Sequence, residues 1–240
     1  MQFYKQRRRI RKTISDFPEK GDVSHHYAEW KGEHFDGLLS RFVSFGRSAN
    51  AIDETRADFA RVPWGPTGDM PKKIEGHETF KQLWFAGNHS DVGGSYPEVE
   101  CRLSDLALLW MIEEATAIPH GLKIAPVFSN GKKVPNTGNK GQALHLFPAA
   151  DGVQHCEVAA MRDVLDARLP AFIRRLFPRA GWKVEIRDID EQAIVHPSVV
   201  ERFELAEVSQ YAGFGPYRPD GLRNHESLKK HYRADSRARA

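Results

Sequence analysis

A short apolar segment, a glycine-rich polar segment and a long apolar segment follow one another in this chain, and this succession most constrains its fold. Residues 82–87, QLWFAG, are apolar without alternation, as in a strand buried on both faces of a parallel or mixed sheet. Residues 88–102 are polar, and residues 103–115 are apolar on nearly all sides, which predicts a buried helix. This order predicts the strand, loop and helix of an α/β protein.

A second strand, loop and helix are expected near the C-terminus. Residues 183–189 alternate apolar and charged side chains, which predicts a strand, and Pro197 fits the first turn of a short helix. His196 would then lie on the loop between them. The repeated pattern predicts a sheet with flanking helices, in which functional side chains occupy the loops at the carboxyl ends of the strands.

Three other segments have weaker patterns. Residues 36–45 place apolar side chains at roughly helical spacing behind Asp36, which predicts a short amphipathic helix. Residues 57–80 are rich in proline and glycine and predict a surface loop. Residues 157–177 predict two helical pieces, with Pro170 in the first turn of the second.

The composition indicates a soluble globular domain between two basic ends. The 240 residues are 40% hydrophobic and 28% charged, and the longest apolar run, 106–112, is far shorter than the roughly 20 residues of a membrane-spanning helix. Residues 1–12 and 229–240 are rich in lysine and arginine, so the domain expected at 13–228 carries a net negative charge. Neither end interleaves aromatic residues with its basic ones, and we expect no nucleic-acid partner.

Candidate catalytic side chains are densest in residues 87–98, GNHSDVGGSYPE. His89 and Asp91 follow the expected strand, where a carboxylate can orient a catalytic imidazole. His196 can act as a general base near neutral pH. An acid followed by a histidine matches the last two members of the α/β-hydrolase triad. The structural alternatives are that Asp91 bonds loop amides and that the His196 ring bonds a backbone carbonyl.

The nucleophile of such a triad has no clear counterpart here. No G-x-S-x-G elbow occurs in the 240 residues. The nearest approach is GRSAN at 46–50, where Ser48 follows an apolar run and Asn50 replaces the second glycine of the elbow. Ser48 therefore meets only half of the pattern for a nucleophile.

A metal site is a further alternative, because four nearby side chains could supply nitrogen and oxygen ligands: His89, Asp91, Glu98 and Asp105. The sequence contains no HExxH motif, G-x-G-x-x-G motif or Walker loop, so we expect neither a metal nor a cofactor. Cys101 and Cys156 are the two cysteines and form no CxxC pair, which argues against a disulfide framework or a structural zinc site.

Several segments together resemble a known family. Residues 83–111, LWFAGNHSDVGGSYPEVECRLSDLALLWM, resemble the hallmark of domain of unknown function 2235, also called DUF2235 or the type VI secretion phospholipase effector Tle1-like catalytic domain. AIDETRADF at 51–59 resembles the stretch that precedes the hallmark in that family. Residues 195–203 and 217–222 resemble the C-terminal end of the family domain.

The resemblance implies an α/β-hydrolase fold and Ser-Asp-His hydrolysis of phospholipid or other carboxylic esters. Asp91 would be the triad acid and His196 the triad base. Four residues of the hallmark loop would support them: His89, Ser90, Gly93 and Gly94. The resemblance also implies a protein that is cytoplasmic in the producing cell and is delivered to the periplasm or membrane of a target cell.

The family's nucleophile elbow precedes the segment at 51–59, and nothing in residues 1–50 matches it. The chain therefore resembles the C-terminal part of the family domain, with a sheet that lacks its N-terminal strands. The expected partners are an ester substrate, a complementing N-terminal half, and a type VI secretion or immunity protein. The alternative is a non-catalytic binding or interaction domain derived from the hydrolase fold.

Overall fold

The computed structural model describes most of the chain between residues 42 and 232. The described residues are 42–59, 71–159, 170, 172–173 and 184–232. Their helices and strands all belong to one compact unit, formed by Val43–Arg61 and Pro71–Ala240.

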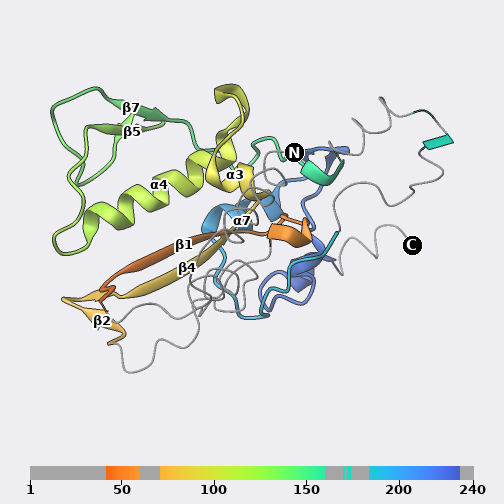
Figure 1. Cartoon of the computed structure of the whole chain (residues 1–240), viewed down its shortest axis with the longest axis horizontal. Coiled ribbons are helices and arrows are strands. Elements are labelled where there is room, and N and C mark those ends of the chain that lie inside the picture. The colour runs from red at the N-terminus through yellow and green to blue at the C-terminus, as the bar shows by residue number, and fades with distance from the viewer. Residues whose placement is uncertain (1–41, 60–70, 160–169, 171, 174–183, 233–240) are drawn as a thin grey trace, which may run out of the picture. The chain divides into compact units, whose positions relative to one another are not determined.

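Two parallel strands lie at the centre of this unit (Figure 1). Strand β1 (Gly46–Ala51) pairs with β4 (Phe80–Phe85). On the other side of β4, Trp84 forms an isolated parallel bridge to Val195. Three extended segments therefore run in the same direction, and their carboxyl ends meet at one edge, as the α/β prediction requires.

Helices α3 (His89–Gly93) and α4 (Arg102–Ala117) pack on one face of the β1–β4 pair (Figure 1). This face is held by a small apolar core: Phe85, Val92, Ala107 and Trp110, with Ala49, Ala51 and Leu83 beside it. Removal of these apolar side chains from water fixes both helices against the strands.

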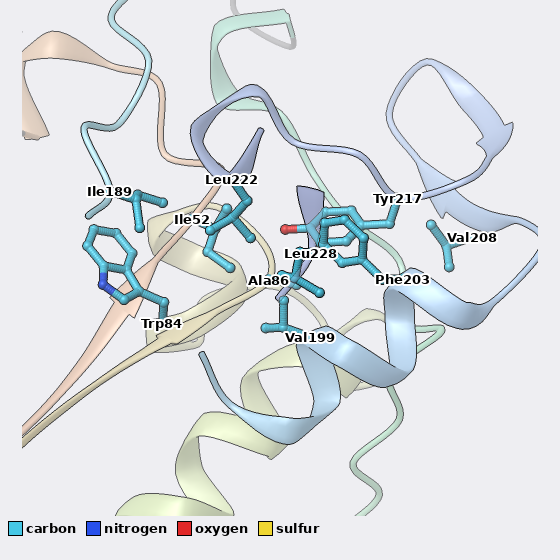
Figure 2. Close-up of a cluster of buried hydrophobic side chains, with 10 residues drawn as sticks. All are labelled: Ile52, Trp84, Ala86, Ile189, Val199, Phe203, Val208, Tyr217, Leu222 and Leu228. Atoms are coloured by element: carbon cyan, nitrogen blue, oxygen red, sulfur yellow. The ribbon is translucent and has the colours of Figure 1, made fainter. Parts of the chain in front are cut away.

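Helix α7 (Pro197–Glu204) and the C-terminal segment form a second core on the other face (Figure 2). Figure 2 shows side chains of β4 and of the residues that directly follow β1 and β4 meeting those of α7 and the C-terminal part of the chain: Ile52, Trp84, Ala86, Ile189, Val199, Phe203, Val208, Tyr217, Leu222 and Leu228. Trp84 and Phe85 face opposite cores, since successive side chains of a strand point to opposite faces.

The remaining described elements are short. Strand β2 (Lys73–Ile74) pairs with β3 (His77–Glu78), and β8 (Val208–Gln210) pairs with β9 (Gly213–Gly215). A three-stranded sheet has β5 (Val127–Ser129) between β6 (Lys132–Lys133) and β7 (Leu144–Leu146). The 3-10 helices are η1 (Ala57–Phe59), η2 (Glu98–Glu100) and η3 (Asp220–Leu222). Among the described residues, no helix has the length and apolar character needed to cross a bilayer.

The main expected elements are confirmed. The strand at 82–87 is β4, the helix at 103–115 is α4, and the helix that begins at Pro197 is α7. The sheets and flanking helices agree with the predicted α/β class. One detail of α4 differs, because Leu108 and Met111 are exposed and the helix is therefore not buried on all sides.

Two predictions for the first part of the described chain are wrong. Residues 42–45, the described part of the helix expected at 36–45, are not helical, and strand β1 begins at Gly46. The loop expected at 57–80 contains η1 and the β2–β3 hairpin, because its glycine and proline residues separate short extended pieces. Residues 36–41 and 60–70 lie outside the described residues.

Two later predictions also need correction. The polar loop expected after β4 contains helix α3, which Asn88 caps through its side chain. In the strand expected at 183–189, only Val184 makes a bridge, an isolated antiparallel one to Arg56. The two basic ends, apart from Lys229 and Lys230, and most of the helices expected at 157–177 lie outside the described residues.

Arg202 of α7 is a fully buried cation that ties several loops to the second core. Its Nη1 donates hydrogen bonds to the carbonyls of Ala150 at 2.5 Å and Gly152 at 2.9 Å, and its Nη2 donates to the Ser209 carbonyl at 3.3 Å. Its guanidinium also lies 5.0 Å from the centre of the Tyr217 ring. These contacts compensate the cost of burying the charge.

We expect Arg202→Met to lower the free energy of unfolding by roughly 2–5 kcal/mol, because the buried carbonyls of Ala150 and Gly152 lose a donor. Urea unfolding followed by circular dichroism measures the change. Arg223→Met is the matched control, since Arg223 pairs with Asp220 at an exposed position. Equal stabilities of the two variants would contradict the role of Arg202.

Candidate functional site

The carboxyl ends of β1, β4 and the segment at Val195 bring several polar residues to one edge. The backbone amide of Trp84 donates to the Ile194 carbonyl at 3.0 Å, and that of His196 donates to the Trp84 carbonyl at 2.9 Å. His196 therefore follows its extended segment directly, as helix α3 follows β4. Sequence reasoning predicted this common edge, which is where α/β proteins place functional side chains.

Asp91 is the most tightly held acid at this edge. It is the third residue of α3, only 2% exposed, and its Oδ2 accepts hydrogen bonds from the amides of Asn88 at 3.0 Å and His155 at 3.1 Å. The Asn88 side chain in turn accepts from the Asp91 amide, which completes a capping box. Burial raises the pKa of Asp91, and the hydrogen bond from His155 opposes that rise.

The imidazole that Asp91 contacts belongs to His155. Asp91 Oδ1 lies 2.7 Å from His155 Nδ1, and Glu100 Oε2 lies 3.2 Å from His155 Nε2. The ring stacks on Tyr96 with 3.6 Å between ring centres. A neutral imidazole donates from one nitrogen only, so the ring donates to both carboxylates only as a cation.

Sequence reasoning missed His155. The residue lies 64 positions after Asp91, and no strand or helix pattern frames it. Tyr96 is the residue that could have pointed to His155, because it lies in the same polar segment as Asp91 and its ring stacks on that of His155. Its hydroxyl donates to Glu157 at 2.5 Å and accepts from Asn88 at 2.9 Å.

In the structure, His196 lies at the N-terminus of α7. Its ring is the N-cap of α7, where Nδ1 accepts from the Ser198 amide at 3.3 Å and lies 2.8 Å from Ser198 Oγ. The ring stacks on Phe85 with 4.5 Å between centres. No hydrogen bond joins His196 to Asp91 in the described part of the chain. Burial lowers the pKa of His196 below its ordinary value of 6.5.

The predicted supporting residues lie around α3 in different settings. His89 is exposed, its backbone amide donates to Glu54 Oε2 at 3.2 Å, and its ring lies 5.4 Å from that of Phe59. Ser90 donates its amide to the cap, and Gly93 and Gly94 end the helix.

Ser48 lies inside strand β1, opposite Gln82 of β4. Its Oγ donates to Asn50 Oδ1 at 3.2 Å. The sharp strand-to-helix turn of a nucleophile elbow is absent from this position, because the strand continues to Ala51.

The four ligands weighed for a metal do not converge in the described residues. Glu98 and Asp105 come together with Cys101, with one ligand atom of each within 4.8 Å of the others. However, Glu98 pairs with Arg102 at 2.7 Å, and Asp105 accepts from the Phe147 amide at 2.7 Å. These bonds already occupy the carboxylates, so the cluster is a network of local hydrogen bonds and ion pairs.

Two more acids complete the edge, Asp53, which is partly buried, and Glu54, which is buried. Asp53 Oδ2 accepts from the Gly87 amide and from the Tyr217 hydroxyl, each at 2.7 Å, and burial raises its pKa. Glu54 lies in a 2.6 Å ion pair with Arg56. Burial favours a higher pKa for Glu54, but the hydrogen bonds from Arg56 outweigh burial and lower it.

The geometry therefore defines an α/β domain with an acid–imidazole pair at the carboxyl edge of its parallel strands. A family model described as "T6SS, Phospholipase effector Tle1-like, catalytic domain" matches residues 13–114. This match confirms the resemblance predicted from the hallmark segment. Searches of curated proteins and of solved structures found no match.

The matched range begins upstream of residue 51, the first residue of the segments that resemble the family. It covers β1, β4, α3 and most of α4. Asp91 lies inside it, whereas His155 and His196 lie beyond its end. The roles expected for residues 195–203 and 217–222 therefore stay predictions.

Gly87 connects β4 to the α3 cap and requires the absence of a side chain. Its φ is +105°, and an added Cβ would overlap the Cβ of Asp91 and lie 2.9 Å from its Oδ2. We expect Gly87→Ala to destabilise the fold by about 2 kcal/mol or more, measured by urea unfolding. Gly93→Ala is the control: it has open space around it and should change stability by less than about 0.5 kcal/mol. Similar losses in both variants would contradict the close approach to Asp91.

Burial of the neutral His196 ring predicts a pH dependence of stability. Because its pKa is lowered in the folded state, the unfolded chain binds this proton more readily, and stability is lost as pH falls from about 6.5 towards the folded pKa. We expect His196→Asn, which keeps a capping side chain, to lose less stability than the natural chain between about pH 7.5 and 5.5. Thermal unfolding across this interval measures the slopes. Identical slopes would show that His196 is not a source of the pH dependence.

Proposed function

We propose that this chain takes part in the hydrolysis of lipid esters, with Asp91 and His155 as its acid and imidazole. The observation that carries the proposal is the 2.7 Å contact between Asp91 Oδ1 and His155 Nδ1. The amides of Asn88 and His155 hold the buried carboxylate in place, and a positioned carboxylate of this kind orients an imidazole and stabilises its cation. The family match supports a phospholipid as the substrate class.

The chemistry requires a serine whose hydroxyl reaches His155 Nε2. The serine oxygen would attack the ester carbonyl while His155 takes its proton, and the proton would then pass to the departing alcohol as the acyl-enzyme forms. Water, deprotonated by the same imidazole, would release the acid and restore the serine. Glu100, 3.2 Å from Nε2 and partly exposed, would have to leave that nitrogen when the serine approaches.

The serine would come from a second polypeptide of the same family that carries a G-x-S-x-G elbow. No such motif occurs in the 240 residues, and Ser48 lies within a strand instead of at a turn. A Tle1-like N-terminal half that carries the elbow is the partner that we propose for this site. Type VI delivery to a target cell, and an immunity protein in the producing cell, follow from the family as further proposals.

His196 remains the alternative base. To serve Asp91 it would have to donate a proton from Nδ1, yet this nitrogen accepts from the Ser198 amide and caps α7. Moving the ring would expose the first turn of that helix. This cost is the reason for preferring His155.

A second candidate function is non-catalytic binding by a domain derived from the hydrolase fold. One observation favours it: both imidazole nitrogens of His155 contact carboxylates, so in this arrangement the ring is held between Asp91 and Glu100. A ring held in this way joins η2 to α3 and needs no substrate.

The test mixes the chain with a separately expressed Tle1-like N-terminal half that contains the elbow, and measures phospholipid hydrolysis and labelling of the serine by a fluorophosphonate. We expect activity in the mixture and a decrease of about 10³-fold or more in kcat/KM for His155→Gln, because the general base is lost.

Ser198→Ala with an intact His196, and His196→Asn, serve as comparison variants. We expect both to retain activity within about tenfold, because they alter the α7 cap and leave the Asp91–His155 contact intact. If only His196→Asn lost hydrolytic activity, His196 would be the general base in place of His155. Absence of both hydrolysis and labelling in the mixture would favour the binding domain.

A further inference from the structure

An open cleft lies along strand β1. Its volume is about 630 Å³, within the range of small-molecule sites. All five residues from Arg47 to Ala51 line it, together with residues of α3 and α4 and with Phe59, Trp84 and Arg187. Asp91 faces His155 from the same short helix α3, so the cleft adjoins the proposed site.

One wall of the cleft is apolar and exposed. Leu108 and Met111 of α4 are 42% and 37% exposed, and both line the cleft beside Val92 and Ala107. The sequence pattern of α4 predicted that Leu108 and Met111 would be buried, and they are not. Large apolar side chains that line a concave surface are typical of a site for an apolar ligand.

The cleft also contains a buried polar group without a partner. Asn50 is only 7% exposed, and its Oδ1 accepts the hydrogen bond from Ser48 Oγ. Its Nδ2 is buried and has no hydrogen-bond partner among the described residues. An unpaired buried donor is costly, so its retention in the wall of a cleft indicates that a ligand oxygen satisfies it.

The cleft also contains positive charge, which favours binding of the oxygen of an acid or ester. Arg187 contributes a guanidinium to the cleft and donates from Nη2 to the Phe59 carbonyl at 2.6 Å. Arg47 also lines the cleft and pairs with Glu114 at 2.6 Å. The lining of the cleft therefore includes a cation and an amide donor as well as apolar residues.

We propose that this cleft binds a fatty acyl group, with its carbonyl or carboxylate oxygen on Asn50 Nδ2 and its hydrocarbon chain along Leu108 and Met111. The proposal rests on the lipid-ester function and names the substrate part that the cleft holds. The acyl group comes either from an intact lysophospholipid or from the free fatty acid, because both present the same oxygen and chain.

The experiment titrates the full chain with sodium oleate and, separately, with oleoyl lysophosphatidylcholine below its critical micelle concentration, and follows displacement of a dansyl-labelled fatty acid. We expect saturable binding of one molecule per chain. Tighter binding of oleate assigns the site to the free acid, and tighter binding of the lysolipid assigns it to the ester. Oleate has no ester bond, so its binding persists even if the hydrolytic proposal fails.

Asn50→Leu tests the donor, and it should fold because it removes the unpaired buried Nδ2 and puts an apolar group of similar size in its place. Ser48 Oγ loses its acceptor in this variant. We expect about tenfold weaker binding of either lipid. Met111→Ser tests the apolar wall and should also weaken binding. Leu122→Ser is the matched control, since Leu122 is 62% exposed and lies outside the residues that line the cleft.

Three results would overturn the proposal. One is an absence of saturable lipid binding by a folded chain. Another is equal affinity of the natural chain, Asn50→Leu and Met111→Ser. The third is self-association of the chain in the absence of lipid, detected by analytical ultracentrifugation and abolished by Asn50→Leu and Met111→Ser. That result would make the edge of β1 an interface between proteins.

Discussion

The parallel pairing of β1 with β4 is the constraint on which the rest of the described structure depends. The pair is covered on both faces: Ala49 and Phe85 face the core with α3 and α4, while Ile52 and Trp84 face the core with α7. Parallel strands are usually buried in this way because their connections place helices on both sides of the sheet. The pairing therefore supports two cores at once, and it also sets the direction in which every following loop emerges.

The direction of the strands concentrates acids at one edge. Asp53, Glu54 and Asp91 all lie beyond the strand ends with little exposure of their carboxylates, and each has partners that hold it. A buried charge without such partners would destabilise the fold by several kcal/mol. The edge is thus a structural junction, and the proposed Asp91–His155 pair lies at it. The lipid-binding cleft proposed along β1 extends this junction towards an apolar surface, as an ester of a long-chain acid requires.

The parts of the fold with strong local patterns could be predicted. The apolar run of β4, the apolar length of α4 and the proline at the first turn of α7 are local signals, and each element forms where expected. Strand β1 was missed because GRSANA has little apolar character of its own and is held by hydrogen bonds to β4 and by packing. Helix α3 was missed because five polar and small residues have no helical periodicity, and the Asn88 cap and Asp91 stabilise the turn instead.

By itself, the sequence determined that an acid follows a buried strand, that a histidine precedes a helix, and that the hallmark segment resembles the Tle1-like family. These features depend on neighbouring residues, whose propensities and spacing act locally. Only the tertiary structure decided which imidazole meets Asp91. His155 reaches it across 64 positions because the segment after β7 returns to α3, while His196 is retained by the cap of its own helix. Such a pairing depends on the packing of distant segments, and no local pattern encodes it.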